Sequence, residues 1–464
     1  MIASYVAWFS YASFRYHDLF LTNGFDFGIF DYMVWNNLHG NFFSGLFIGE
    51  KSHLSLHFQL ILLPLAPIYL IWPDAKALLF IQSLVLGLGA LPIYWLAENR
   101  LNRWMGVGFA AVYLLFPALQ GANLTEFHTV PLAAGFLAYA YWYLRCSNFK
   151  MLLLFSLLAA ACQEDVLIIV GMMGFYLYLT QKDFRGIILG LVGFGGFLIL
   201  SLLIIPSFAS HRELHFALLR YKTLGGSIPN ILTTFGTRPD FVWNFVMSEP
   251  DRVRYLTHLL APVAYLSLFD PLTLLIIVPT VLLYLLSDVP TMFALDRFQY
   301  SAVVVPFVVA SAINGTAFLV TVLHQKRGFS LKFLYTLFAV AILLASVGYH
   351  LKFGHTPVSL SFNLPAAEAR HQTAYRMLEL IPAEAVVSAQ AGLSPHVTHR
   401  PGAYLFPFLT SAEHGPAEYI ALDSIGNVYP LQPEKYNSLV TELRTSGDYK
   451  VIFEQDGYIL LQRQ

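Results

Sequence analysis

Charged side chains are scarce in this sequence. Only 12% of its 464 residues are Asp, Glu, Lys or Arg, whereas a soluble globular domain carries roughly a quarter. The 27 basic and 28 acidic residues leave a formal charge of −1, so no basic surface is large enough for nucleic-acid binding. This composition argues against a soluble protein, and the 57% hydrophobic content indicates a lipid bilayer as the partner.

Cysteine is nearly absent as well. Cys146 and Cys162 are too few for a disulfide framework, and neither lies in a CxxC motif or a Cys/His cluster with zinc-site spacing. These observations exclude a structural zinc site and a redox motif. No internal repeat of fixed period and no low-complexity segment is present.

Long apolar runs are abundant instead. A membrane span needs about 20 residues with few charges. Six runs lack Asp, Glu, Lys and Arg and predict spans: residues 77–97, 104–125, 127–144, 186–210, 298–325 and 333–351. Four shorter runs (151–163, 166–181, 255–269 and 271–287) and residues 1–14, which have no basic region typical of a signal peptide, bring the expected number to about eleven.

The basic residues between these runs predict the orientation, because cytoplasmic loops are enriched in Lys and Arg. With the clusters at 100–103, 145–150, 182–185 and 326–332 inside, the outer segments are 18–76, 125–128, 163–165, 206–252, 287–300 and everything after 350. Residues 57–72, which contain Pro64 and Pro67, are then expected to lie at the outer interface or to re-enter. The two cysteines fall on opposite faces and are not expected to pair.

The composition becomes that of an ordinary soluble protein from about residue 354. Helices are expected over 365–380 and 434–444, and the last segment, "YKVIFEQDGYILLQRQ", predicts a hairpin around Asp456-Gly457, a pair typical of a type I′ turn. The predicted fold class is therefore mainly α: a polytopic helical bundle (1–353) with a small extracytoplasmic α/β domain (354–464).

The first outer segment carries candidate catalytic residues. In "FDFGIFDYMVWNNLHG" the apolar residues recur at helical spacing, which predicts an interfacial helix. Asp26 stands just before it, as a helix cap or as a catalytic carboxylate, and Asp31 lies on its flank. His53 and His57 are four residues apart, a spacing compatible with a metal or phosphate site. A divalent metal has no full ligand set here.

Further acidic residues lie between predicted spans, where ionisable groups are costly and are usually functional or paired. Glu126 and His128 follow one span, and Glu164 and Asp165 lie between two others. They either cap short outer turns in contact with water or line a site. Arg297, Gln299 and Tyr300 occupy another outer loop, and the predicted topology brings all these groups to one face. Carboxylates, imidazoles and aromatics together suit a site for a sugar and a phosphate.

Several segments resemble one family. "FDFGIFDYMVWNNLHG", "HFQLILLPLAPIYLIWP", "FPALQGANLTEFHTVPLA", "CQEDVLIIVGMMGFYLY" and, in the outer domain, "SAQAGLSPHVTHRPGAYLFP" are similar to the DUF2079 family of bacterial and archaeal membrane proteins. That family resembles the GT-C glycosyltransferase superfamily in architecture. The first span is short against the family, which predicts a start codon upstream.

This resemblance implies transfer of a sugar from a polyprenyl-phosphate donor to an acceptor on the outer face of a bacterial plasma membrane, with inversion. Asp26 would be the general base and Asp31 a second acid near the acceptor. His53, His57 and His128 would hold the donor phosphate or assist its departure. Glu164 and Asp165 would orient those groups or bind acceptor hydroxyls. The two acids of the first loop are five positions apart, whereas many GT-C enzymes have an adjacent pair.

Two other classes remain open. A transporter would need ionisable groups near the bilayer midplane and often an inverted repeat, neither of which the sequence indicates. A non-catalytic binding or assembly protein would use the outer α/β domain as its contact surface. The sugar, the acceptor and the oligomeric state are not specified by the sequence.

Overall fold

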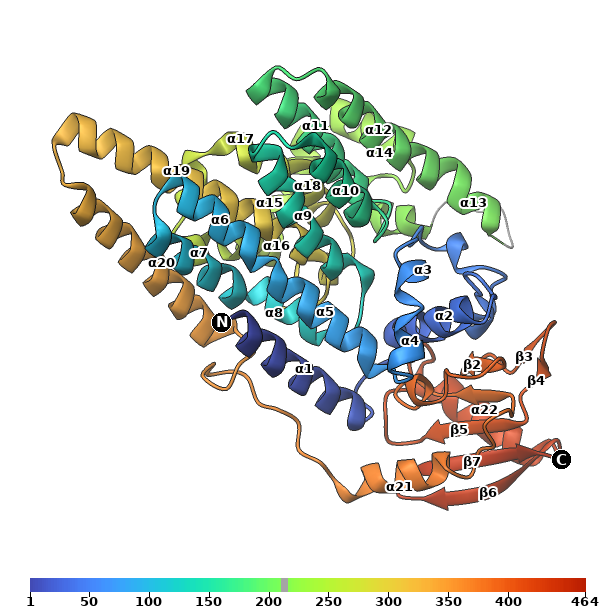
Figure 1. Ribbon diagram of the computed structural model, residues 1–464. Helices are drawn as coiled ribbons and strands as arrows, with labels where there is room; N and C mark the ends of the chain where they lie inside the picture. The colour runs from blue at the N-terminus through green and yellow to red at the C-terminus, as the bar shows by residue number, and fades with distance from the viewer. Residues whose placement is uncertain (210–215) are drawn as a thin grey trace.

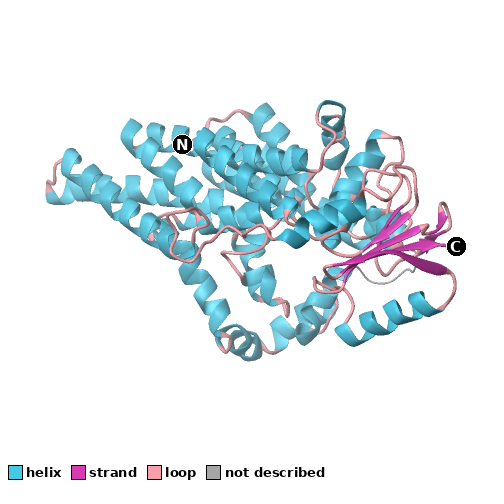
Figure 2. Cartoon of the chain, turned by 90° about the horizontal axis from the view of Figure 1, so that it is seen from below, coloured by secondary structure: helices cyan, strands magenta, loops and turns pink. Residues whose placement is uncertain are grey.

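The computed structural model describes residues 1–209 and 216–464. A long helical part is followed by a smaller α/β part (Figure 1), and the strands gather beside the C-terminus (Figure 2). The mainly helical class with a small C-terminal α/β part, as expected from the sequence, is confirmed. The helices up to the gap are α1 (Ile2–Asp18), α2 (Ile29–Leu38), α3 (Leu62–Leu65), α4 (Ile68–Ile71), α5 (Lys76–Leu88), α6 (Ala90–Arg100), α7 (Arg103–Leu115), α8 (Pro117–Leu124), α9 (Thr129–Arg145), α10 (Phe149–Ala160), α11 (Val166–Gln181), α12 (Arg185–Ile199) and α13 (Ile205–Phe208). The bundle continues with α14 (Ile228–Thr237), α15 (Pro239–Met247), α16 (Pro250–Leu260), α17 (Pro271–Leu274), α18 (Val278–Leu285), α19 (Val305–Arg327) and α20 (Leu331–Phe353).

Fewer helices than expected are long enough to cross a membrane. Among the described residues, four pass by length and apolar composition, and five if the pair α7 and α8, bent by 43°, counts as one span. The other predicted spans are short or interrupted: α10 has 12 residues, and run 255–269 breaks at Pro262 and at Ala264 and Tyr265, whose φ angles are positive. The last residue of run 186–210 and part of the predicted outer loop 206–252 lie outside the described residues.

The long helices differ in how deeply they are buried. The apolar window that includes α19 is 83% buried, while those of α12 and α20 are only 17% buried. Their exposed side chains include Leu191, Leu203 and Leu344. Large apolar surfaces of this kind are stable only against lipid or a partner. The helix α19 therefore lies at the centre of the bundle, and α12 and α20 lie at its exposed apolar edge.

Glycines allow α11 and α12 to approach closely. A Cβ atom on Gly174 would lie 2.4 Å from the backbone nitrogen of Gly190, and one on Gly193 would lie 2.6 Å from Gly171 Cα. Small residues at facing positions are the usual way for membrane helices to maximise van der Waals contact. The connection between these helices ends α11 at Lys182 in the left-handed conformation.

Residues 57–72 do not form a spanning helix. They contain α3, which includes Pro64, and α4, which begins after Pro67, with four residues each. A ten-residue apolar stretch, 62–71, reaches roughly 15 Å at 1.5 Å per residue, about half of the hydrocarbon core. This agrees with the expectation that the segment stays at the interface or re-enters. Both cysteines are free.

The α/β part has a five-stranded sheet in the order β2-β1-β5-β7-β6. One core packs α21 (Ala369–Leu378) against one sheet face, and a second packs α22 (Pro433–Thr445) against the other. The expected hairpin is present: Asp456 and Gly457, both with positive φ, join the last two strands. The strands are β1 (Val387–Ala389), β2 (Ala403–Leu405), β3 (Thr410–Ser411), β4 (Gly415–Pro416), β5 (Tyr419–Asp423), β6 (Tyr449–Gln455) and β7 (Tyr458–Arg463), with β3 and β4 pairing separately.

The α/β part docks onto the first loop through a buried carboxylate. Asp31, on α2, is completely buried. It accepts hydrogen bonds from the hydroxyls of Tyr69 and Thr398, and His399 Nε2 lies 3.0 Å from its Oδ1. Since a buried charge is tolerated only when it is paired and hydrogen-bonded, this network fixes the position of the domain on the loop.

We expect Asp31→Ala to destabilise the protein strongly. The substitution leaves two buried hydroxyls and the partly buried His399 without their shared acceptor, and breaking a buried pair typically costs about 3 kcal/mol or more. The measurement is thermal unfolding of the detergent-solubilised chain. Asp18→Ala is the matched control, because Asp18 makes a 2.6 Å ion pair with Lys76 while 45% exposed, and exposed pairs contribute about 0–1 kcal/mol. Equal melting shifts for both variants would contradict the assigned role of the network.

The same network predicts a pH dependence. Burial lowers the pKa of His399, but the Asp31 carboxylate outweighs burial and holds the pKa above its ordinary value. A raised folded-state pKa stabilises the protein below the unfolded value of about 6.5, and this contribution is lost as the pH rises through the folded pKa. The stability advantage of wild type over His399→Gln should therefore be largest at acidic pH and shrink at alkaline pH. A stability difference between wild type and His399→Gln that grows as the pH rises would contradict this prediction.

Candidate active site

Asp26 lies in a wide turn that leads into α2. Residues Gly24–Gly28 form one π-helical turn, η1, whose cap is Asn23: its side chain accepts a hydrogen bond from the backbone N–H of Phe25. The reading of Asp26 as the helix cap is therefore wrong. With its backbone inside the turn, Asp26 carries a side chain that is 54% exposed, so its carboxylate is accessible to a substrate.

Glu126 holds this turn in place. One of its carboxylate oxygens accepts from the backbone N–H of Asn23 at 2.8 Å, and the other from that of Phe27 at 3.2 Å. Gln82 fixes the Glu126 loop in turn, donating to the Glu126 carbonyl at 2.7 Å and accepting from the His128 N–H at 2.8 Å. Burial and the nearby Asp26 carboxylate raise the pKa of Glu126 well above its ordinary value. Glu126 thus positions the backbone on both sides of Asp26.

His128 is the side-chain neighbour of Asp26 across the site. Its Nε2 lies 3.4 Å from Asp26 Oδ1, and its side chain is only 5% exposed. The ring packs edge-on against Phe30, with centroids 5.6 Å apart. Partial burial raises the pKa of Asp26, but His128, Arg220 and His57 outweigh it, so the pKa lies below its ordinary value. Asp26 is therefore ionised at neutral pH.

His57, Glu164 and Asp165 form a second group next to the first. His57 Nδ1 lies 2.8 Å from Glu164 Oε1, and the other oxygen of Glu164 accepts from the Phe58 N–H at 3.0 Å. Burial raises the pKa of Glu164, but His57 outweighs it and lowers the pKa to about 2. Burial and the Glu164 charge raise the pKa of Asp165 to about 6. The acidic pair is thus split into one firmly ionised group and one that titrates near neutrality.

Arg220 links the two groups, although the sequence analysis did not select it. It follows the gap, in the turn η5 (Phe216–Leu224), and lowers the pKa of both Asp26 and Asp165. Its guanidinium carbon lies 5.7 Å from the centre of the Tyr300 ring. The sequence offers one weak signal, a basic residue on the predicted outer face, but several others share that loop.

Other candidate residues lie outside this group. Asp31 belongs to the domain contact described above. His53 is buried, and its Nε2 lies 2.7 Å from Gln59 Oε1. Burial lowers the pKa of His53 to about 4. His53 and His57 therefore have different partners rather than one shared ligand. Gln299 precedes the turn η9 (Tyr300–Val304) and makes a backbone contact there, its carbonyl accepting from the Ala302 N–H at 3.4 Å.

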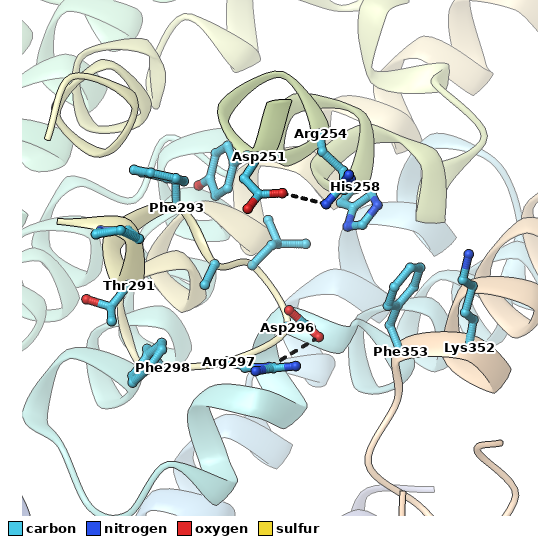
Figure 3. A pocket seen from close by; sticks show the side chains of 14 residues that line it. Asp251, Arg254, His258, Thr291, Phe293, Asp296, Arg297, Phe298, Lys352 and Phe353 are labelled. Atoms are coloured by element: carbon cyan, nitrogen blue, oxygen red, sulfur yellow. Dashed lines mark hydrogen bonds and ion pairs between the residues drawn. The ribbon is translucent and has the colours of Figure 1, made fainter. Parts of the chain in front are cut away.

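Arg297 lines a different cavity, of about 660 Å³. Its side chain is 75% exposed, and its Nε lies 3.9 Å from Asp296 Oδ2. Figure 3 shows this pair across the cavity from the pair Asp251 and Arg254, with Lys352 on a third side. Arg297 thus lines this cavity, whereas Tyr300, three residues later, packs against Arg220.

Metal binding finds no further support from the geometry. Within 1–209 and 216–464, no three His, Cys, Asp or Glu side chains converge in a way that could hold a metal ion. The chemistry available at the Asp26 group is that of carboxylates, imidazoles and one guanidinium.

Comparison with known proteins gives the following similarities. No curated protein matches the sequence. ArnT from Cupriavidus metallidurans bound to undecaprenyl phosphate is similar with 11% identity and a TM-score of 0.49, over 98% of this chain and 97% of that one. The apo form of the same protein is 12% identical with a TM-score of 0.47, over 94% of this chain and 93% of that one. Similarity also extends to the oligosaccharyltransferase AglB from Archaeoglobus fulgidus in complex with an inhibitory peptide and a dolichol-phosphate. The identity is 11% and the TM-score 0.49, over 86% of this chain and 65% of that one.

The family comparison covers nearly the whole chain. The family described as "Predicted membrane protein (DUF2079)" matches residues 16–460, which include the Asp26 turn, every acidic group of the site and the α/β part. The sequence resemblance to this family is confirmed. The chain belongs to the DUF2079 family of predicted membrane proteins.

Proposed function

We propose that this protein is an integral-membrane glycosyltransferase that transfers a sugar from a polyprenyl-phosphate donor to an acceptor hydroxyl. The observation that carries the proposal is the exposed, ionised Asp26 beside the buried His128, with Arg220 among the charges acting on it. Transfer from a lipid phosphate requires a base for the acceptor and a cation for the departing phosphate. The resemblance of the family to GT-C enzymes indicates the same reaction class.

Asp26 acts as the general base in a single displacement. It takes the proton of the acceptor hydroxyl while the acceptor oxygen forms a bond to the anomeric carbon. The bond from that carbon to the phosphate oxygen breaks, and its electron pair leaves with the polyprenyl phosphate. Because attack and departure occur on opposite sides, the anomeric configuration inverts. A positioned carboxylate of this kind typically contributes about 10²–10⁴-fold to the rate.

Arg220 stabilises the phosphate of the donor. Its guanidinium offers several N–H donors in a planar arrangement that matches phosphate oxygens. Arg220 interacts electrostatically with Asp165 on one side and with Asp26, the base, on the other. Tyr300 packs against it. Asp31 serves as a positioning residue, since it anchors the α/β part to the helix that follows Asp26.

The site faces outward in this proposal. The sequence places the basic clusters in the cytoplasm and the segments of Asp26, Glu126, Glu164 and Tyr300 on the other side. The α/β part, which docks on the first loop, is then extracytoplasmic. A bacterial plasma membrane is the compartment that this arrangement and the family resemblance favour.

We expect Asp26→Asn to lower sugar transfer by about 10²–10⁴-fold, because the amide cannot accept the acceptor proton. The assay compares purified wild type and variant with a panel of polyprenyl-phosphate sugars. Asp240→Asn is the control, since Asp240 is an exposed acid on α15. Full activity of Asp26→Asn would remove Asp26 as the base. Absence of transfer by wild type from every donor would instead favour a non-catalytic assembly protein or a transporter.

Arg220→Gln should weaken donor use. The loss of one charge-assisted contact to a phosphate, worth about 1.5–3 kcal/mol, raises the donor KM about tenfold or more, and the acceptor KM stays near the wild-type value. The matched control is Arg238→Gln, because Arg238 stacks on Phe241 with 4.6 Å between guanidinium and ring centre. Equal donor constants for the two variants would contradict the assignment of Arg220.

A further inference from the structure

A second polar cavity lies between the first loop and the α/β part. Its volume is about 350 Å³, within the range of about 300–1,000 Å³ typical of ligand sites. One wall is the chain that leaves α1, residues 19–23, together with Glu126, and the other wall comes from the α/β part. The end of α1 and α21 lie on either side of this junction (Figure 1).

Two buried polar groups that line this cavity have no hydrogen-bond partner within the described chain. Tyr458, at the start of β7, is completely buried, and its hydroxyl is unpaired. Arg370 donates to Asp423 Oδ1 at 2.6 Å, but its Nε is buried and unpaired. The Arg370 guanidinium carbon lies 4.5 Å from the centre of the Tyr458 ring. Buried polar atoms normally form hydrogen bonds. A ligand in the cavity would provide the hydrogen-bond partner that these two atoms lack within the described chain.

The charges around the cavity are already matched. Arg370 is paired with Asp423, and the Glu126 carboxylate accepts two backbone N–H groups. These two charged side chains are thus engaged within the chain, and His371, which also lines the cavity, accepts from the Glu368 N–H through its Nδ1 at 3.0 Å. Hydroxyl groups, by contrast, donate and accept at once, which fits both the Arg370 Nε–H and the Tyr458 hydroxyl. Phe20 adds an aromatic side chain to the wall.

We propose that this cavity binds a neutral sugar unit of the acceptor. Glu126 lines the cavity and also holds the turn that carries Asp26. A sugar bound here therefore lies beside the residue that positions the base. The identification of the sugar as part of the acceptor rests on the proposed function. Sugar binding itself does not require transfer.

Binding is tested on the full chain in lipid nanodiscs without any donor. Saturation-transfer NMR with the methyl glycosides of glucose, galactose, mannose and N-acetylglucosamine should detect saturable binding of at least one. Tyr458→Phe, which removes only the unpaired hydroxyl, should weaken that affinity about fivefold, the effect of one hydrogen bond. Leu21→Trp, which fills the rim from the loop side, should abolish it.

Tyr419→Phe is the matched control. Tyr419 lies on the neighbouring strand β5, and its hydroxyl accepts from Gln462 Nε2 at 3.0 Å, at a different surface hollow. This variant should bind like wild type. Absence of saturable binding of every glycoside, or equal affinities for Tyr458→Phe, Leu21→Trp and wild type, would overturn the proposal.

Kinetics then separate this inference from the proposed function. With an active donor, Tyr458→Phe should raise the acceptor KM by a similar factor while kcat and the donor KM stay unchanged. A protein that binds a glycoside in this cavity but transfers no sugar supports the cavity and contradicts the transferase. A protein that transfers sugar with the same acceptor KM in wild type and Tyr458→Phe contradicts the cavity as acceptor site and leaves the transferase standing.

Discussion

The arrangement of the site depends on the hydrogen bonds from the Asn23 and Phe27 backbone to Glu126. These two bonds bridge the π-helical turn, a conformation that is rare and is frequently found at functional sites. The bridge stabilises the π-helical turn relative to a regular α-helix, and this turn keeps the Asp26 side chain exposed. Glu126 itself is fixed by Gln82, so hydrogen bonds connect α5, the loop before α9 and the turn before α2.

Low charge density explains why each ionisable group of the site has its own compensation. In a chain with 12% charged residues, an uncompensated carboxylate near the membrane is costly. Glu164 is held by His57, Asp26 by His128, and Asp31 by two hydroxyls and His399. These separate pairings compensate three carboxylates, and Arg220 acts electrostatically on Asp26 and on Asp165.

The helical class, the final hairpin and the gathering of Asp26, His57, His128, Glu164 and Asp165 followed from the sequence, because apolar runs, a turn dipeptide and the positions of basic loops are local signals. The number of spans did not, since proline and positive φ angles interrupt runs that are continuous in composition. The burial of Asp31 could not be predicted from the sequence either. Its partners Thr398 and His399 are more than 360 positions away, and no periodicity in one sequence reports such a contact. Arg220 was missed for the same reason.

Geometry and electrostatics of the proposed base are controlled by different residues. Glu126 makes hydrogen bonds only to the backbone of the Asp26 turn, although it also feels the Asp26 charge, whereas His128 and Arg220 lower the pKa of the Asp26 carboxyl. A change at Glu126 therefore moves the base with little direct change in its charge partners, and a change at His128 alters its basicity while the turn stays braced. Because the polar cavity borders Glu126 and none of the charge partners, a ligand there acts on where the base lies more than on how strongly it accepts a proton.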